Sequence, residues 1–259
     1  MSTFLFSEII FGPVSSRRLG VSLGINLLPT NSKLCNFNCI YCECGWNRHE
    51  LGEKDTFHER ETVYEMLEYK LAEMQANNEP LDVITFAGNG EPTLHPYFAE
   101  IIDDTIFLRN KYFPKVRIAV LSNATRIEIP KIRKALLKID QNILKLDSAF
   151  NSTVKLLNNP QKNFSVEKLV ENLNIFKGKL TIQTMFVRGN VNEKIVDNTT
   201  EKELLAWEQL IAEIKPQNVM IYTIARETPL ETLNKVSLEE LKNIASRIEK
   251  YGIEVQVSG

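Results

Sequence analysis

Runs of apolar, β-branched residues alternate with helical patterns from one end of the chain to the other, and this alternation limits the possible folds more than any other feature. The predicted strands cover residues 21–28, 82–88, 116–122, 142–147, 180–187, 218–224 and 253–258. The predicted helices lie between them, over residues 58–78, 96–112, 130–139, 165–177, 200–214 and 237–251. Six units of strand and helix indicate a parallel sheet covered by helices, because parallel strands need crossover connections.

Six units are too few for a closed eight-unit barrel. We therefore expect an α/β fold with a partial (β/α)6 TIM-like barrel, and an open doubly wound sheet is the alternative. Both folds bind ligands at the carboxyl ends of their strands. No linker, repeat or low-complexity segment interrupts the pattern, which predicts a single domain over residues 1–259.

Charge and hydropathy narrow the function classes. With 31 Lys and Arg against 33 Asp and Glu, the net charge of −2 gives no overall basic field that would demand a nucleic-acid partner. No apolar run approaches the ~20 residues that span a bilayer. The opening MSTFLFSEIIF contains Glu8 and is interpreted as a first strand rather than a signal peptide. We expect a cytoplasmic protein without a membrane partner.

The chain places all its thiols in the stretch KLCNFNCIYCECGW, just after the predicted strand 21–28. They are Cys35, Cys39, Cys42 and Cys44. A disulfide framework is not favoured in a large chain with no cysteine elsewhere, and reducing conditions in the cytoplasm weaken it further. A structural zinc site usually needs a second, separated pair of ligands, and the nearby His49 and His58 do not supply the usual pair.

An iron–sulfur cluster held by thiolates is the third interpretation. Three close cysteines around a four-iron cluster leave one iron with an open position, as catalytic metals have and structural metals lack. Apolar neighbours such as Phe37, Ile40 and Tyr41 would shield such a cluster from water. Cys44 follows Cys42 after a single residue, and we interpret it as a non-ligand.

The spacing C-x3-C-x2-C in CNFNCIYC, with Tyr41 before the last cysteine, resembles the motif of the radical S-adenosylmethionine (SAM) superfamily. The resemblance implies a [4Fe–4S] cluster on Cys35, Cys39 and Cys42, and SAM bound to the open iron. It also implies that an electron from the cluster cleaves SAM to a 5′-deoxyadenosyl radical, which abstracts hydrogen from a substrate.

The segment FAGNGEPTLHP is similar to the Gly-Gly-Glu-Pro segment of the same superfamily. Its residues Gly88, Asn89, Gly90 and Glu91 are candidates for binding the amine of SAM. Two glycines let the backbone pass close to a ligand, and carbonyls at a strand end accept hydrogen bonds from an amine. A plain glycine-rich turn is the alternative for this segment taken alone.

Polar residues at other strand ends complete the predicted cofactor site. Lys145 and Asp147 alternate on one strand and so share a face, as do Gln183 and Met185 on another. The cofactor-contacting candidates, besides those of the glycine-rich segment, are Tyr41, Ser122, Asn123, Asp147, Gln183, Thr223, Ile224 and Arg226. Arg17 and Arg18 could hold an anionic substrate, or form a solvated surface pair.

Longer segments, among them GPVSSRRLGVSLGINLLP and QTMFVRGN, resemble a group of small proteins similar to tRNA wyosine-base synthases. That resemblance extends from about Gly12 to Arg226. The additional cysteines that hold the second cluster of those synthases are absent, so we expect neither a second cluster nor their tRNA reaction.

The expected function is therefore radical SAM chemistry on an unidentified substrate: an RNA base, a peptide or a small metabolite. No flavodoxin-like half is present in the sequence, and the resemblance implies an external low-potential electron donor of the flavodoxin or ferredoxin type. Two alternatives stay open, a radical-generating activase for a partner enzyme and a zinc-binding interaction module.

Overall fold

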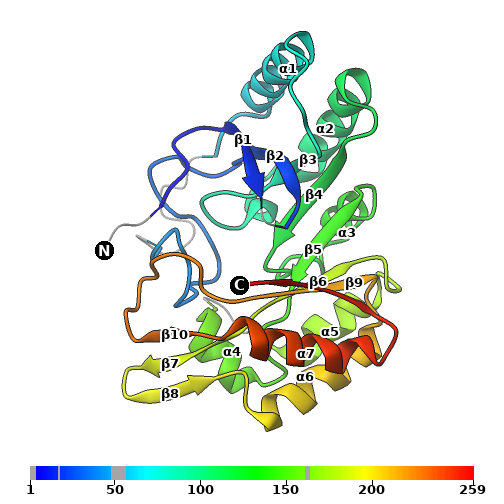
Figure 1. The fold of residues 1–259 in the computed structure, drawn as a ribbon. Helices are drawn as coiled ribbons and strands as arrows, with labels where there is room; N and C mark the ends of the chain where they lie inside the picture. Colours follow the sequence, from blue (N-terminus) through cyan, green and yellow to red (C-terminus); the bar gives the residue numbers. More distant parts are fainter. Residues whose placement is uncertain (1–3, 17, 48–56, 161–163) are drawn as a thin grey trace.

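A computed structural model describes residues 4–16, 18–47, 57–160 and 164–259. Arg17 and His49 lie outside the described residues. The main sheet has eight strands in the order β1-β2-β3-β4-β5-β6-β9-β11 (Figure 1). Their bounds are Ile10–Ser16, Gly20–Ile25, Val83–Phe86, Arg117–Ser122, Gln141–Lys145, Thr181–Met185, Asn218–Tyr222 and Glu254–Ser258.

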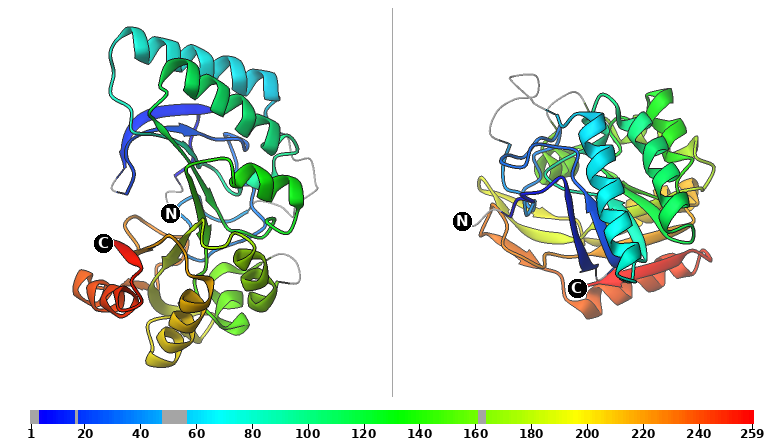
Figure 2. Two further views of the ribbon diagram at one scale, coloured as in Figure 1. Left: turned by 90° about the vertical axis from the view of Figure 1, so that its right-hand side faces the viewer. Right: turned by 90° about the horizontal axis from the view of Figure 1, so that it is seen from above.

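Helices connect the parallel strands and cover the outside of the sheet (Figure 2). They are α1 (Arg60–Ala76), α2 (Phe98–Tyr112), α3 (Pro130–Leu136), α4 (Asn151–Asn158), α5 (Val166–Asn174), α6 (Glu201–Ile214) and α7 (Leu238–Glu249), with a 3-10 turn over Pro92–Leu94. The apolar stripe of α1, with Val63, Leu67 and Leu71, is buried against the sheet. Ser237 and Glu240 form a capping box that begins α7.

The strand order confirms the prediction of an incomplete barrel. From β2 to β11 each strand pairs in parallel with the next one of the sheet, and the order never reverses. A doubly wound sheet would contain a reversal, its switch point. The sheet is therefore a curled half-barrel, and the carboxyl ends of its parallel strands, from β2 to β11, lie at one rim.

Several elements differ from the sequence prediction. The sequence predicted a first strand in the opening MSTFLFSEIIF. The observed strand β1 begins only at Ile10, ends at Ser16 and pairs antiparallel with β2. A three-stranded sheet, in the order β10-β7-β8, was not expected. Its strands are β7 (Val187–Val191), β8 (Lys194–Asp197) and β10 (Leu233–Lys235). These strands and α4 are short, and short elements give little hydrophobic periodicity to detect.

The inner face of the half-barrel is arranged in layers. Val83, Ala119, Ile143 and Met220 form an apolar cluster with Leu19 at the amino ends of the strands. Two residues further along each strand the side chains point the same way, because strands alternate with a period of two. The next layer holds Leu121, Lys145, Gln183 and Tyr222, which line a cavity. An apolar floor thus supports a polar layer.

Among the described residues, a hydrogen bond from a side-chain amide joins the edge strand β11 to the turn that follows the other edge strand, β1. Gln256, on β11, donates its Nε2–H to the carbonyl of Arg18, in the turn between β1 and β2, at 2.9 Å. This contact crosses the side of the barrel where two strands of a closed barrel would pair. It brings the β1–β2 turn over the polar layer.

Candidate functional site

The cysteine loop follows β2 and is attached to the rim by main-chain bonds. Leu34 donates its N–H to the carbonyl of Asn89 at 2.8 Å, and Glu91 donates its N–H to the carbonyl of Leu34 at 3.1 Å. Leu34 and Gly90 form an isolated parallel bridge. The first cysteine is thereby fixed beside the end of β3.

The glycines of the GNGEP segment permit this attachment. A Cβ on Gly90 would lie 1.8 Å from the carbonyl oxygen of Leu34, and the residue has a φ of +141°. A Cβ on Gly88, whose φ is +150°, would lie 2.4 Å from Oδ1 of Asn26. The sequence suggested that these glycines make room for a ligand; in the structure both make room for neighbouring parts of the protein itself.

A buried cation faces the thiols. Lys33 is 4% exposed, and its Nζ donates to the carbonyl of Gly45 at 2.9 Å. Burial acts to lower the pKa of Lys33, but attraction to the thiolates of Cys42, Cys35 and Cys39 outweighs it and raises the pKa. The lysine therefore stays charged and compensates negative charge on the cysteine loop.

Amide groups also donate to the sulfurs. The backbone N–H of Phe37 bonds Sγ of Cys35 at 3.4 Å, and Nδ2 of Asn123 lies 3.6 Å from the same atom. Nδ2 of Asn158 donates to Sγ of Cys39 at 3.4 Å. Donors of this kind stabilise thiolates and tune iron–sulfur clusters.

Cys42 and Cys44 form a hydrogen-bonded pair. The bond from Cys44, with the charge of Lys33 as a smaller contribution, lowers the pKa of Cys42 to about 5 despite burial. The same bond and burial raise the pKa of Cys44. Sγ of Cys44 also lies 3.6 Å from the carbonyl of Gly88, which is a second possible acceptor for its single S–H.

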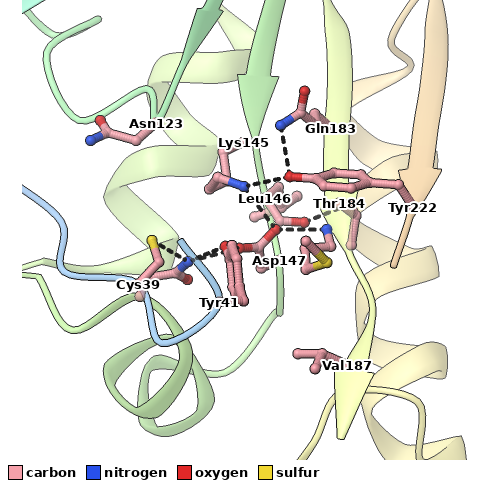
Figure 3. Close-up of polar contacts among 12 residues, drawn as sticks. Cys39, Tyr41, Asn123, Lys145, Leu146, Asp147, Gln183, Thr184, Val187 and Tyr222 are labelled. Atoms are coloured by element: carbon pink, nitrogen blue, oxygen red, sulfur yellow. Dashed lines mark hydrogen bonds and ion pairs between the residues drawn. The ribbon is translucent and has the colours of Figure 1, made fainter. Parts of the chain in front are cut away.

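Two buried side chains, Asp147 and Asn158, brace the cysteine loop through Tyr41. Figure 3 shows Asp147 beside Tyr41. Asp147 accepts hydrogen bonds from the hydroxyl of Tyr41 and, at 2.7 Å, from Nδ2 of Asn158. Its other oxygen accepts the N–H of Met185 at 3.0 Å. Asp147 therefore ties the cysteine loop to the end of β6.

Glu91 is a second buried brace. Its Oε1 accepts hydrogen bonds from the backbone N–H and the hydroxyl of Thr93, and from the hydroxyl of Ser122 at 2.9 Å. Its Oε2 accepts the N–H of Asn123 at 2.6 Å. Burial raises the pKa of Glu91, although these bonds oppose the rise. The carboxylate joins the end of β3 to the end of β4.

A polar row crosses the opposite wall (Figure 3). Tyr222 accepts hydrogen bonds at its hydroxyl from Lys145, at 3.2 Å, and from Nε2 of Gln183, at 2.9 Å. Oε1 of Gln183 accepts in turn from Nη1 of Arg18 at 3.1 Å. Burial acts to lower the pKa of Lys145, but Asp147 and Tyr222 raise it well above its ordinary value. This wall is cationic.

A cavity of about 270 Å³ gathers most of the predicted site. All four cysteines line it. So do nine of the cofactor candidates: Tyr41, Gly88, Gly90, Glu91, Ser122, Asn123, Gln183, Ile224 and Arg226. Asn89, Asp147 and Thr223 are not among its lining residues. Asn89 bonds the backbone of Phe6 and Pro29, Asp147 braces Tyr41, and Thr223 accepts the N–H of Val236.

Some lining residues gave little signal in the sequence. Lys33 precedes the motif and resembles any surface lysine, and Tyr222 lies within the predicted strand 218–224 among apolar residues. Tyr222 lies two residues after the buried Met220, and the period of two along a strand could have placed it inside the barrel. Lys33 offered no such pattern, because it lies in a loop.

The donor set fits the thiolate-bound cluster implied by the sequence. Three cysteines reach one cavity, where burial raises the pKa of Cys35 and Cys39 and the charge of Lys33 and the amide donors oppose that rise. These donors would stabilise the thiolate form that iron binds. Among the described residues, no three Cys, His, Asp or Glu side chains surround a point that one metal ion could occupy. In the same part of the chain, no helix is long and apolar enough to cross a membrane.

Comparison with known families gives a match to the radical SAM superfamily over residues 32–202. A protein named GTPase Obg of Brachyspira hyodysenteriae is 32% identical over 98% of the chain, but the chain spans only 35% of that protein. A UPF0026 protein of Methanocaldococcus jannaschii is 29% identical, with 91% of the chain and 70% of that protein covered. One from Synechocystis is 31% identical, with coverages of 86% and 77%.

Solved structures share the fold at low identity. TYW1 with a lysine-pyruvate adduct bound has a TM-score of 0.63 at 19% identity, covering 90% of this chain and 74% of that one. A radical SAM methyltransferase from Sphaerobacter thermophilus gives 0.68 at 12%, with coverages of 92% and 65%. Streptococcus suis SuiB bound to S-adenosylmethionine gives 0.62 at 13%, with coverages of 91% and 50%.

Proposed function

Because the chain belongs to the radical SAM superfamily, and within it to the UPF0026 proteins, it is an enzyme whose cofactors are a [4Fe–4S] cluster and SAM, and we propose that it reductively cleaves SAM and abstracts hydrogen from a substrate. The observation that carries this proposal is the convergence of Cys35, Cys39 and Cys42 with the GNGEP segment on one cavity.

The three motif cysteines would hold the cluster. When bound, the cluster and SAM supply an electron and a 5′-deoxyadenosyl radical. Lys33 compensates the charge of the thiolate set, while Asn123 and Asn158 donate N–H groups to two sulfurs. Tyr41 covers the loop, held by Asp147.

The rim carbonyls and amides would orient SAM. The carbonyl of Gly88 is a possible acceptor for the thiol of Cys44 here, and it is the acceptor that a bound amine would use instead. Ser122 and Asn123 come to the cavity because Glu91 holds them. Gln183, Ile224 and Arg226, on the far wall, are suited to the nucleoside end of the cofactor.

Anaerobic reconstitution tests the proposal directly. The reconstituted protein should be brown, contain about four iron per chain and release 5′-deoxyadenosine when SAM and a strong reductant are added. Cys39→Ala should abolish the release. Cys44→Ala should retain it, because Cys35, Cys39 and Cys42 of the C-x3-C-x2-C motif all remain.

The same preparation separates the alternatives. A colourless protein with one tightly bound zinc would contradict the enzyme and support a zinc-binding interaction module. Loss of 5′-deoxyadenosine in both cysteine variants would make Cys44 a ligand. A glycyl radical formed in a partner protein would show that this protein is a radical-generating activase. The substrate would then be a glycine residue of that partner.

A further inference from the structure

The wall opposite the cysteine loop has two cations, Arg18 and Lys145, and within the described part of the chain only Lys145 has a carboxylate partner. Arg18 is half-buried and lines the cavity, and its single side-chain hydrogen bond there goes to Oε1 of Gln183. No Asp or Glu among the described residues forms an ion pair with it. A guanidinium group has five N–H donors, so most of this one's donors are unused.

Lys145 adds a second positive charge to this wall. Its side chain is 13% exposed, and its one carboxylate neighbour is Asp147, at 3.5 Å. That carboxylate already accepts bonds from Tyr41, Asn158 and Met185. The wall therefore has two cations and one carboxylate that is largely engaged elsewhere.

Tyr222 completes the arrangement. Its hydroxyl oxygen accepts from both Lys145 and Gln183, so its lone pairs are used while its own O–H has no acceptor among the described residues. The guanidinium of Arg18 lies over the ring, with Cζ 4.8 Å from its centre. This cation–π contact holds the guanidinium beside the ring, and the N–H donors that Gln183 does not use can bond an oxyanion.

We propose that Arg18, Lys145 and Tyr222 form a subsite for an oxyanion, a carboxylate or phosphate group, of the enzyme's substrate. The inference rests on the proposed function, because SAM would reach from the cysteine loop to Gln183, Ile224 and Arg226, and the oxyanion of the substrate would lie beside it in the same cavity. Planar, bidentate donors of arginine match both carboxylate and phosphate. Arg226 differs from Arg18 in this respect, because an ion pair with Glu43, at 2.6 Å on the rim, compensates its charge.

The test uses reconstituted, SAM-bound protein under anaerobic conditions, with three probes. Inorganic phosphate is followed by its ³¹P line width, and succinate and the neutral succinamide by saturation-transfer NMR. The variants are Arg18→Gln, which removes the charge, and Arg18→Lys, which keeps it. The matched control is Arg60→Gln, which removes a surface arginine paired with Asp104.

The wild-type protein should bind phosphate or succinate but not succinamide. Arg18→Gln should weaken that binding about tenfold or more, as expected for a charge-assisted hydrogen bond. Arg18→Lys should restore part of it, and Arg60→Gln should match the wild type. Phosphate binding alone would indicate a phosphate ester, and succinate binding alone a carboxylic acid.

Three results would overturn the subsite: no anion binding to the wild type, equal binding to Arg18→Gln, or a SAM dissociation constant raised by the same factor in Arg18→Gln. The last would assign the arginine to the cofactor. A wild type that releases 5′-deoxyadenosine without binding an anion disproves the subsite alone. One that binds the anion but releases no 5′-deoxyadenosine disproves the proposed function alone.

Discussion

At the scale of single residues, the site depends on side chains that touch the cysteines without being ligands. Asn158 illustrates this, since one amide group reaches Sγ of Cys39, the hydroxyl of Tyr41 and the carboxylate of Asp147. It comes from the end of α4, an element that the sequence did not predict. Sequence spacing identifies cysteines far more easily than the amides that serve them.

Asn158→Ala should make the cluster harder to reduce. Removing an N–H donor from a thiolate lowers the stability of the reduced cluster, so the midpoint potential should become more negative. The variant should also lose about 1–3 kcal/mol of stability, because two buried partners lose a hydrogen bond. A potentiometric titration followed by electron paramagnetic resonance measures the first effect, and urea unfolding the second.

Asn243→Ala is the control for this change, since Asn243 is exposed on α7. Its potential and stability should match the wild type. An unchanged potential in Asn158→Ala would show that the amide braces Tyr41 and Asp147 without acting on the cluster.

At the scale of elements, the attachment of the cysteine loop to the end of β3 is the decisive contact. Gly90→Ala should prevent it, because the added Cβ would meet the carbonyl of Leu34 and the φ of +141° is strained for alanine. We expect a loss of about 3 kcal/mol or more, together with reduced iron content after reconstitution. Thermal unfolding and iron analysis measure the two effects.

Gly252→Ala separates the clash from the strain. Gly252 also has a positive φ, +74°, but a Cβ there has nothing within 4 Å. Its variant should lose only about 1 kcal/mol and keep its iron. Equal losses in the two variants would contradict a role for the contact with Leu34.

The start of α2 should make stability depend on pH. His95 is buried, with Nδ1 accepting the N–H of Tyr97 at 3.1 Å and Nε2 donating to the carbonyl of His58 at 2.8 Å. Burial lowers the pKa of His95, so the folded protein holds the neutral ring. Its contribution is complete above the unfolded pKa of about 6.5 and is lost as the pH falls through the lower folded value.

The free energy of unfolding in urea should therefore fall between pH 7.5 and pH 5.5 by more in the wild type than in His95→Gln. Glutamine cannot take up a proton in this range, so the titration disappears with the ring. The same fall in both proteins would assign the acid sensitivity to other groups.

The repeating units were predictable from the sequence because each combines a buried strand with an amphipathic helix. Tyr41, Glu91 and Gln183 could be placed at the cavity since each lies at a strand end or in the motif. Asp147 and Thr223 lie at strand ends too, yet they serve as braces. Which residues at a rim face inward depends on the loops that follow, and a linear pattern does not contain that information.

At the scale of the whole molecule, the half-barrel is held closed on its open side by Gln256 and the backbone of Arg18. Gln256→Ala should cost about 1 kcal/mol, the value of one ordinary hydrogen bond. Hydrogen exchange should become faster at Ser16 and at Arg18 to Gly20, between β1 and β2, and remain unchanged in α1. Unchanged exchange in the turn would mean that other contacts hold the two edges together.

The main-chain attachment of the cysteine loop also determines when iron can enter. Leu34 can meet Gly90 only after β2 and β3 have paired. These strands are separated in the sequence by α1, and pairings between distant segments form late in folding. In small zinc-dependent domains, by contrast, the metal drives folding itself. Here the peptide scaffold should mature first, so cells starved of iron would accumulate an intact, loadable precursor rather than an unfolded chain.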